Sequence, residues 1–343
     1  MNLIFSLTRP WLLIMVILLH YRVFNDDLLM SLCIGGGYLI DTQRFVYQLC
    51  KIAVPLYFLM SGYFLYNKKK LTSSTYKQIL IKRVKSLIVP YLLWNLASLI
   101  LNILGGNILF HSKDIGDILI LFIKQTPSLG PINHPLWYLR DLFIFVLISP
   151  ICYIIGKSVF KHVLLLVLIL LWLIGLCDTI TYDGFGGLLF FYSGILLNIN
   201  DIDIYRKIKT LANRIHLYIA AYMICSILLV LYRDDLSGIY LKLCTLVGIW
   251  LFVSLLERHK NRLIKSQSWN LSQNSFFLYC MHGIFTGSVS GILTKIAIIV
   301  QHPLIFILLQ VIIIFGAIVV LCLFSKLVKN ITPIAYSILS GGR

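Results

Sequence analysis

The chain of 343 residues is 59% hydrophobic and 13% charged, and its mean hydropathy is +0.90. A soluble protein of this length needs more polar surface than this composition provides. Apolar runs of about 15–25 residues recur along the chain and are long enough to cross a bilayer as helices. A net charge of +17 would suggest a nucleic-acid partner, but the basic residues gather in short segments between apolar runs, which indicates membrane orientation instead.

The predicted class is therefore an all-α polytopic membrane protein. A transmembrane barrel would show short alternating segments, which this sequence lacks. No polar stretch is long enough to fold by itself, so residues 1–343 are expected to form a single integral-membrane domain. Eight cysteines are spread singly, without a C-x-x-C pair, which predicts buried thiols and no zinc site.

The first apolar run reads RPWLLIMVILLH from Arg9 to His20. No basic segment precedes Arg9 and no small-residue cleavage site follows, so residues 10–24 are predicted to be a retained helix. The step from Arg9 to His20 is three helical turns plus about 20°, with a rise of ~16 Å, so both side chains lie on the same face of the helix. Arg9 is then expected at the cytoplasmic interface and His20 near the midplane, where polar residues usually mark a site. Alternatively, Arg9 is a topology anchor and His20 a hydrogen-bonded interior residue.

Ten membrane spans fit the apolar runs, and more than two thirds of the 30 Lys and Arg residues then fall in segments on one side. By the positive-inside rule that side is the cytoplasm, and it holds both termini. The most basic of these segments runs from Lys68 to Lys85. The loops on the other side contain Gly, Pro, Asn and Asp, which are typical of turns. The predicted spans are residues 10–24, 48–66, 87–104, 136–155, 162–177, 186–199, 215–232, 239–256, 274–298 and 303–325.

Three other predicted spans carry polar or small residues at depth. His282, in SFFLYCMHGIF, is ~12 Å inside its helix. Asn95, in VPYLLWN, is comparably placed. Ser61 and Gly62, in VPLYFLMSGYF, lie toward the cytoplasmic side of the second span. Each has a structural alternative, with His282 as a packed interior residue and Ser61-Gly62 as a small-residue helix contact.

The fourth span opens with HPLWYLRDLFIF and enters from the outside. Arg140 and Asp141 are expected in its outer third, either in a site or as a buried structural ion pair. Trp137 and Tyr138 are placed to stack on a sugar near the outer side, or to form an interfacial aromatic belt. Together the polar residues of five spans predict a polar channel from the cytoplasmic face past the midplane to the outer leaflet.

At these residues the sequence resembles the acyltransferase-3 family of multispanning membrane acyltransferases. RPWLLIMVILLH resembles the family's first-helix Arg–His pattern, and VPLYFLMSGYFL its Ser-Gly second span. KRVKSLIVPYLLW, HPLWYLRDLFIFVLISP and SFFLYCMHGIF resemble its basic third-span entry, its fourth span and its late Ser…Tyr…His helix. The matches cover residues 9 to 285. One departure is Ser86, which stands where the family often has a second Arg, so Lys82 and Lys85 would have to serve instead.

The resemblance implies transfer of an acyl group, usually acetyl, from cytoplasmic acyl-CoA to a hydroxyl of a surface polysaccharide or lipid-linked sugar, at the cytoplasmic membrane of a bacterium. It implies no metal. A cationic mouth suits the phosphates of acetyl-CoA, and His20 is the expected base or nucleophile, the choice between the two staying open. The other residues are expected to orient His20, polarise the carbonyl or hold the sugar. The candidates are His20, Asp141 and His282 for catalysis, Arg9, Ser61, Lys82, Arg83 and Lys85 for the donor, and Asn95, Trp137, Tyr138 and Arg140 for the acceptor.

Two other classes stay open. A secondary transporter would also contain ten spans and buried His, Arg and Asp, but it should show repeat symmetry, which is not visible here. A flippase or polymerase for a polysaccharide precursor would share the glycan, but its basic residues should face outward, toward the lipid-linked phosphate. In this chain most of them are predicted to face inward.

Overall fold

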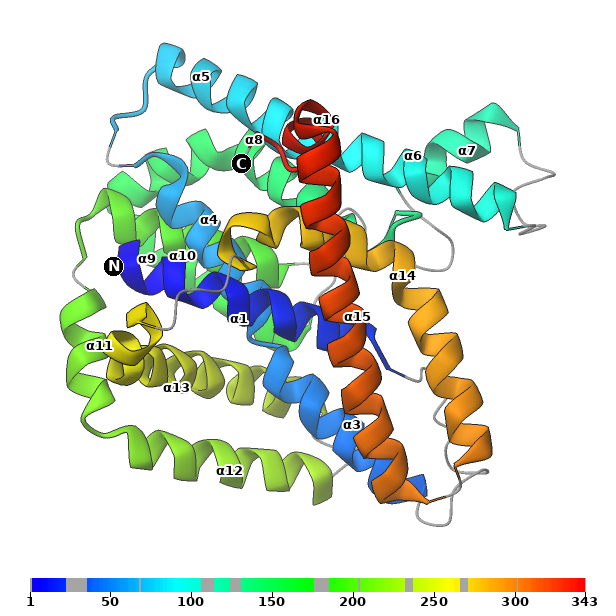
Figure 1. The fold of residues 1–343 in the computed structure, drawn as a ribbon. Helices are drawn as coiled ribbons and strands as arrows, with labels where there is room; N and C mark the ends of the chain where they lie inside the picture. Colours follow the sequence, from blue (N-terminus) through cyan, green and yellow to red (C-terminus); the bar gives the residue numbers. More distant parts are fainter. Residues whose placement is uncertain are drawn as a thin grey trace. The chain divides into compact units, whose positions relative to one another are not determined.

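The computed structural model describes residues 2–22, 36–67, 69–105, 114–123, 131–175, 185–202, 204–231, 237–265, 271–300 and 302–342. Every regular element in these ranges is a helix and none is a strand, which confirms the predicted all-α class (Figure 1). The chain forms two compact units, each assembled from two separate stretches. The expectation of a single domain therefore stays a prediction, and the units are described one at a time.

Six helices of the described chain are long and apolar enough to cross a membrane. Four shorter apolar helices lie where the other four predicted spans were placed. The total of ten spans and the cytoplasmic position of both termini stay predictions. The six long helices are Leu39–Leu65, Ser73–Leu104, His134–Lys157, Gly238–Ile264, Asn274–Ile299 and Pro303–Ile331, and the shorter ones are Phe5–His20, Lys161–Ile174, Phe185–Ile199 and Ile215–Leu228.

Unit 1 consists of residues Met1–Ala53 and Ile204–Leu327. Its first helix packs against three others, α3, α13 and α14, while α12 packs against α3 and α13. The side chains of Leu12, Leu13 and Ile17 on the first helix are almost completely buried, because these apolar residues face the neighbouring helices. The helices are α1 (Asn2–His20), α3 (Gly36–Cys50), α11 (Ile204–Ala212), α12 (Ile215–Leu231), α13 (Ser237–Lys265), α14 (Leu271–Ile299) and most of α15 (Pro303–Ile331).

Unit 2 consists of residues Val54–Asp203 and Val328–Arg343. Its helix α8 packs against α5, α9 and α10, and α16 packs against α6. A five-residue π-helical turn, Val84–Ile88, joins α5 to α6 without a break and is called the π-turn below. The helices are α4 (Ala53–Leu65), α5 (Ser73–Arg83), α6 (Val89–Leu104), α7 (Ile115–Leu121), a 3₁₀ turn (His134–Leu136), α8 (Trp137–Lys157), α9 (Lys161–Ile174), α10 (Phe185–Ile199) and α16 (Pro333–Leu339).

Predicted boundaries were wrong in three segments of the chain. The first helix begins at Asn2 and not at residue 10, because Phe5 and Leu7 are buried and extend its apolar face. It ends at His20, whereas the predicted span ran on to residue 24. Residues 36–47, predicted to be an outer loop, belong to α3. Residues 73–83, predicted to be a basic loop, form α5, whose N-cap Thr72 accepts a hydrogen bond from the Thr75 amide.

Helices α4 and α10 pass one another with their backbones in contact. A Cβ atom at Gly62 would lie 2.0 Å from the Phe191 carbonyl oxygen, and a Cβ at Gly194 would lie 2.1 Å from that of Leu59. The two glycines thus permit a reciprocal close approach, as small residues do at membrane helix contacts. The helix-contact interpretation of the Ser61-Gly62 pair is confirmed for Gly62, and this contact positions Ser61 on α4.

Candidate active site

Two of the predicted catalytic residues lie next to each other in unit 1. His20 is the last residue of α1, and His282 lies in α14, which packs against α1. Their ring centroids are 5.2 Å apart, and the rings meet edge to face at 68°. His282 has no exposed surface, while His20 is partly exposed. The pair therefore consists of a completely buried imidazole, that of His282, in contact with a partly exposed one, that of His20.

Backbone hydrogen bonds indicate the tautomer of both imidazoles. His20 Nδ1 lies 2.7 Å from the Val16 carbonyl oxygen, and His282 Nδ1 lies 2.5 Å from that of Tyr279. A carbonyl oxygen only accepts, so Nδ1 carries the hydrogen in each neutral ring and Nε2 is left with its lone pair. His282 Nε2 has no hydrogen-bond partner within the described residues. A buried acceptor of this kind is suited to take a proton or a hydrogen bond from a ligand.

Two tyrosines that were not among the predicted site residues contact His282. The Tyr21 hydroxyl donates to the His282 carbonyl oxygen at 3.2 Å, and its side chain is completely buried. The rings of Tyr21 and Tyr279 lie 6.3 and 5.7 Å from the His282 ring, measured between centroids. Tyr21 directly follows His20, which is a signal that could have pointed to it. The hydrogen bond ties the end of α1 to α14 at the point where the histidines meet.

Arg9 lies on the same continuous helix as His20, as predicted. The helix α1 runs from Asn2 to His20, so the ~16 Å rise between the two residues is preserved. The Arg9 side chain is exposed. Its expected place at the cytoplasmic interface, and the midplane position of His20, stay predictions.

In unit 2, three predicted residues from three helices converge. The Ser61 and Tyr138 hydroxyls are 3.0 Å apart, so α4 is hydrogen-bonded to the start of α8. Arg83, half-buried at the end of α5, is close enough to Tyr138 for an electrostatic interaction. The ring of Phe58 packs 4.6 Å from that of Tyr138 and 6.4 Å from that of Trp137, centroid to centroid.

Tyr138, predicted to contact the acceptor, therefore lies near Ser61 and Arg83, which were predicted to contact the donor. The donor and acceptor roles of these residues stay predictions. The physical reason for the proximity is that α5 is a helix packed along the first half of α8, where the Tyr76 hydroxyl donates to the Leu147 carbonyl oxygen at 2.9 Å. Lys82 on α5 and Lys85 in the π-turn lie on either side of Arg83 in the sequence, and both side chains are exposed.

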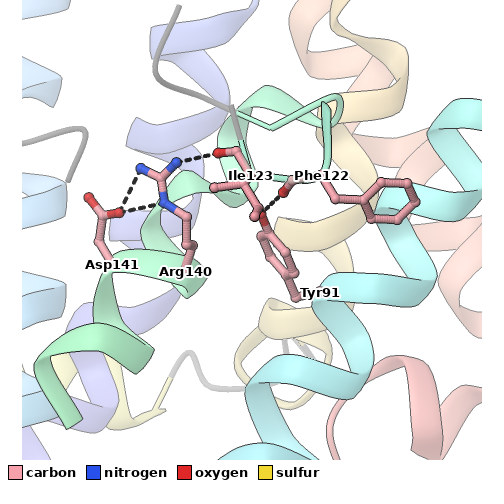
Figure 2. Close-up of polar contacts among 5 residues, drawn as sticks. All are labelled: Tyr91, Phe122, Ile123, Arg140 and Asp141. Atoms are coloured by element: carbon pink, nitrogen blue, oxygen red, sulfur yellow. Dashed lines mark hydrogen bonds and ion pairs between the residues drawn. The ribbon is translucent and has the colours of Figure 1, made fainter. Parts of the chain in front are cut away.

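Arg140 and Asp141 form an ion pair, which was one of the two alternatives (Figure 2). The Arg140 Nε and Nη2 atoms donate to Asp141 Oδ1 at 2.9 and 2.8 Å. The third donor, Nη1, bonds the Ile123 carbonyl oxygen, and Tyr91 bonds that of Phe122. Asp141 is completely buried. The guanidinium thus fixes Ile123 to α8, and the Tyr91 hydroxyl fixes Phe122 to α6. This structural role accounts for the burial of the ion pair.

Asn95 is also held by backbone partners. Its Nδ2 donates to the Tyr91 carbonyl oxygen at 2.8 Å, and its Oδ1 accepts from the Asn133 amide at 3.0 Å. The side chain is completely buried. Asn95 therefore pins the segment before α8 to α6, while its predicted contact with the acceptor stays a prediction.

The fold and these residues define an all-helical membrane protein with a paired-imidazole centre in one unit and a cluster of Ser61, Arg83 and Tyr138 in the other. The family model described as an acyltransferase domain, Acyl_transf_3, matches residues 4–326, and the chain therefore belongs to the acyltransferase-3 family. The match confirms the resemblance and favours an acyltransferase over a transporter or polymerase. No curated protein and no solved structure gave a significant match.

Proposed function

We propose that the protein is a membrane-bound O-acyltransferase of a bacterial cytoplasmic membrane. It moves an acyl group, acetyl in the first instance, from cytoplasmic acyl-CoA to a hydroxyl of an extracytoplasmic or lipid-linked glycan. The observation that carries this proposal is the His20–His282 pair, in which both Nδ1 atoms are bonded to backbone carbonyls, so that each neutral ring carries its lone pair on Nε2. An imidazole in that form is a competent base at neutral pH.

His20 carries the chemistry in this proposal. In the direct route, the glycan hydroxyl oxygen bonds to the thioester carbonyl carbon while its proton passes to His20 Nε2. The C–S bond then breaks, and the leaving thiolate recovers the proton as CoA thiol. In the covalent route, His20 Nε2 bonds to the thioester carbonyl carbon, and the C–S bond breaks so that CoA leaves as thiolate. The glycan hydroxyl oxygen then takes the acyl group from the imidazole, and the hydroxyl proton passes to the thiolate to give CoA thiol.

The role proposed for His282 is narrower than the catalytic roles that were predicted from the sequence. Its Nδ1 hydrogen is used by the Tyr279 carbonyl, so the neutral ring has no second N–H with which to polarise a thioester carbonyl. Its Nε2 can accept, and a proton-bearing His20 or a substrate hydroxyl is the natural donor. We assign His282 the role of stabilising the positive charge that develops on His20 during proton transfer.

Cations on α1, α5 and the π-turn are proposed to hold the donor. Guanidinium and ammonium groups bind phosphate through charge-assisted hydrogen bonds. Arg83 is half-buried near Tyr138, which is hydrogen-bonded to Ser61, whereas Arg9, Lys82 and Lys85 are exposed. We expect Arg83 to make the oriented phosphate contact and the others to supply a screened attraction.

The test is glycan mass analysis of cells with and without the gene, complemented by the wild-type or the His20→Ala chain. An acetyl group adds about 42 Da to one sugar. The proposal expects that difference with the wild-type gene and not with His20→Ala. Identical glycans in all strains, together with no release of CoA thiol by the purified protein, would contradict it.

A further inference from the structure

The helix α16 packs onto the beginning of α6, within unit 2 (Figure 1). The Trp94 indole Nε1 donates to the Leu339 carbonyl oxygen at 3.1 Å. Tyr336 is 3% exposed, and Lys329 Nζ lies 5.6 Å from the centroid of its ring. The family match ends at residue 326, so α16 lies beyond it. This chain thus anchors an additional segment at the entry of its third predicted span.

The π-turn next to α16 has an identifiable cause. Pro90 has no N–H to donate, and its ring crowds the carbonyl four residues earlier, which is that of Ser86. The helix accommodates this by widening over Val84–Ile88, where the Val89 amide bonds the Val84 carbonyl five residues back. Relative to a continuous α-helix the π-turn contains one extra residue, and single π-turns of this kind are frequent at functional sites.

Gly341 fits against the carbonyl that Pro90 displaces. A Cβ atom at Gly341 would lie 2.6 Å from the Ser86 carbonyl oxygen and 3.1 Å from the Ser86 Cα. Because these are backbone atoms, the clash could be relieved only by moving the main chain. Gly341 also has φ +68, a conformation that favours glycine. Gly342 has a similar φ of +74, but a Cβ there would meet nothing within 4 Å.

The conformation of the π-turn decides where the basic residues of α5 point. Arg83 immediately precedes it and Lys85 lies in it. If the turn relaxed into a regular α-helix, the loss of one residue would rotate α5 by about 100° relative to α6. Arg83 would then turn away from Tyr138. An element that locks the π-turn therefore locks the direction of the Arg83 guanidinium.

We propose that α16 is a buttress for the acyl-donor site and that Gly341 is a positioning residue for the donor, because it seats α16 on the Ser86 carbonyl and holds the π-turn. The proposal rests on the proposed function, in which Arg83 and Lys85 bind the donor phosphates. Gly341 itself touches neither substrate. It acts through the backbone of the π-turn.

Gly341→Ala and Gly342→Ala provide a matched pair for the test, because both place a side chain at positive φ and only the first meets Ser86. On the purified full chain, hydrogen exchange of the peptide covering residues 84–91 and the kinetics with acetyl-CoA are measured. Gly341→Ala should speed exchange in that peptide and raise the KM for acetyl-CoA about tenfold at unchanged kcat, by the cost of an overpacked contact. Gly342→Ala should change neither quantity.

Arg83→Ala and Trp94→Phe complete the experiment. Trp94→Phe removes the bond to Leu339 without adding a group, so it should shift both readouts in the same direction as Gly341→Ala, even where the glycine variant folds poorly. If hydrogen exchange over residues 84–91 is as slow in Gly341→Ala and Trp94→Phe as in the wild type, the proposal that α16 holds the π-turn is wrong. Faster exchange with an unchanged KM, while Arg83→Ala raises the KM, overturns the positioning role and leaves the proposed function standing. If Arg83→Ala also leaves the KM unchanged, the proposed donor site is wrong.

Discussion

At the scale of single residues, the two imidazoles make the sharpest prediction. Removing a general base typically costs 10²–10⁴-fold in rate. His20→Ala should therefore abolish detectable acetyl transfer while expression and donor binding stay near wild type. Arg9→Ala, on the same helix, should instead raise the apparent KM for the donor. Transfer is measured as CoA thiol release over a range of acetyl-CoA concentrations up to saturation, which gives both kcat and KM.

The comparison with His282→Ala decides between the two histidines. If His20→Ala retains more than about a tenth of the wild-type rate while His282→Ala is inactive, the base is His282. The α1 motif would then be an anchoring element, and the roles assigned above would be exchanged.

His282→Asn separates the chemistry of His282 from its packing. The Asn amide can still donate to the Tyr279 carbonyl in place of Nδ1, but it has no atom at the Nε2 position. A hydrogen bond to a charged group contributes about 1.5–3 kcal/mol, which corresponds to a loss of roughly ten- to a hundredfold in rate. We expect a loss of that size in kcat with an unchanged unfolding temperature. Full activity of His282→Asn would show that His282 only packs.

Individual site residues could be predicted from the sequence better than their partners. His20 and His282 are recognisable because a titratable group in an apolar helix needs an explanation. Their contact across 262 positions of sequence is set by the packing of α1 on α14, which hydropathy does not encode. The same limit explains Tyr138, whose place beside Ser61 depends on the packing of α4 and α5 along α8.

At the scale of elements, the crossing of α4 and α10 should be sensitive to one methyl group. Gly62→Ala or Gly194→Ala puts a Cβ about 2 Å from a main-chain oxygen, and overpacking costs about 1–3 kcal/mol or more. We expect a lower midpoint of thermal unfolding in detergent for both. Gly291→Ala is the control, because a Cβ there meets nothing within 4 Å, and helix propensity favours Ala over Gly by up to ~1 kcal/mol. Equal midpoints for all three variants would contradict the close contact.

Helix boundaries were predictable only where apolar residues continue to the end of the element. Most cores of the predicted spans lie inside observed helices, since long apolar runs leave few alternatives. The helix α3 was missed because Asp41, Gln43 and Arg44 lower its hydropathy, although Leu39 and Ile40 are buried. The helix α5 was missed because it has no buried residue and carries two lysines and an arginine, so its pattern resembles that of a basic loop.

At the scale of the whole molecule, the net charge of +17 is distributed so that one face is expected to attract an anionic donor. Replacing Lys82, Arg83 and Lys85 together by Ala should weaken acetyl-CoA binding and flatten its dependence on salt. The reason is that the Debye length falls from about 10 Å at 0.1 M to about 3 Å at 1 M, which screens exposed charges. Equilibrium dialysis across that salt range measures both effects.

The same three residues also belong to the charge bias that is predicted to orient the chain, so topology must be measured on the same variant. Reporter fusions at each terminus should give cytoplasmic signals in the wild type, as the positive-inside rule requires. If the triple variant keeps that orientation and loses donor affinity, the cations act on the donor directly. If donor affinity is unchanged at every salt concentration, the cluster serves only to set topology, and the phosphate contacts must lie elsewhere.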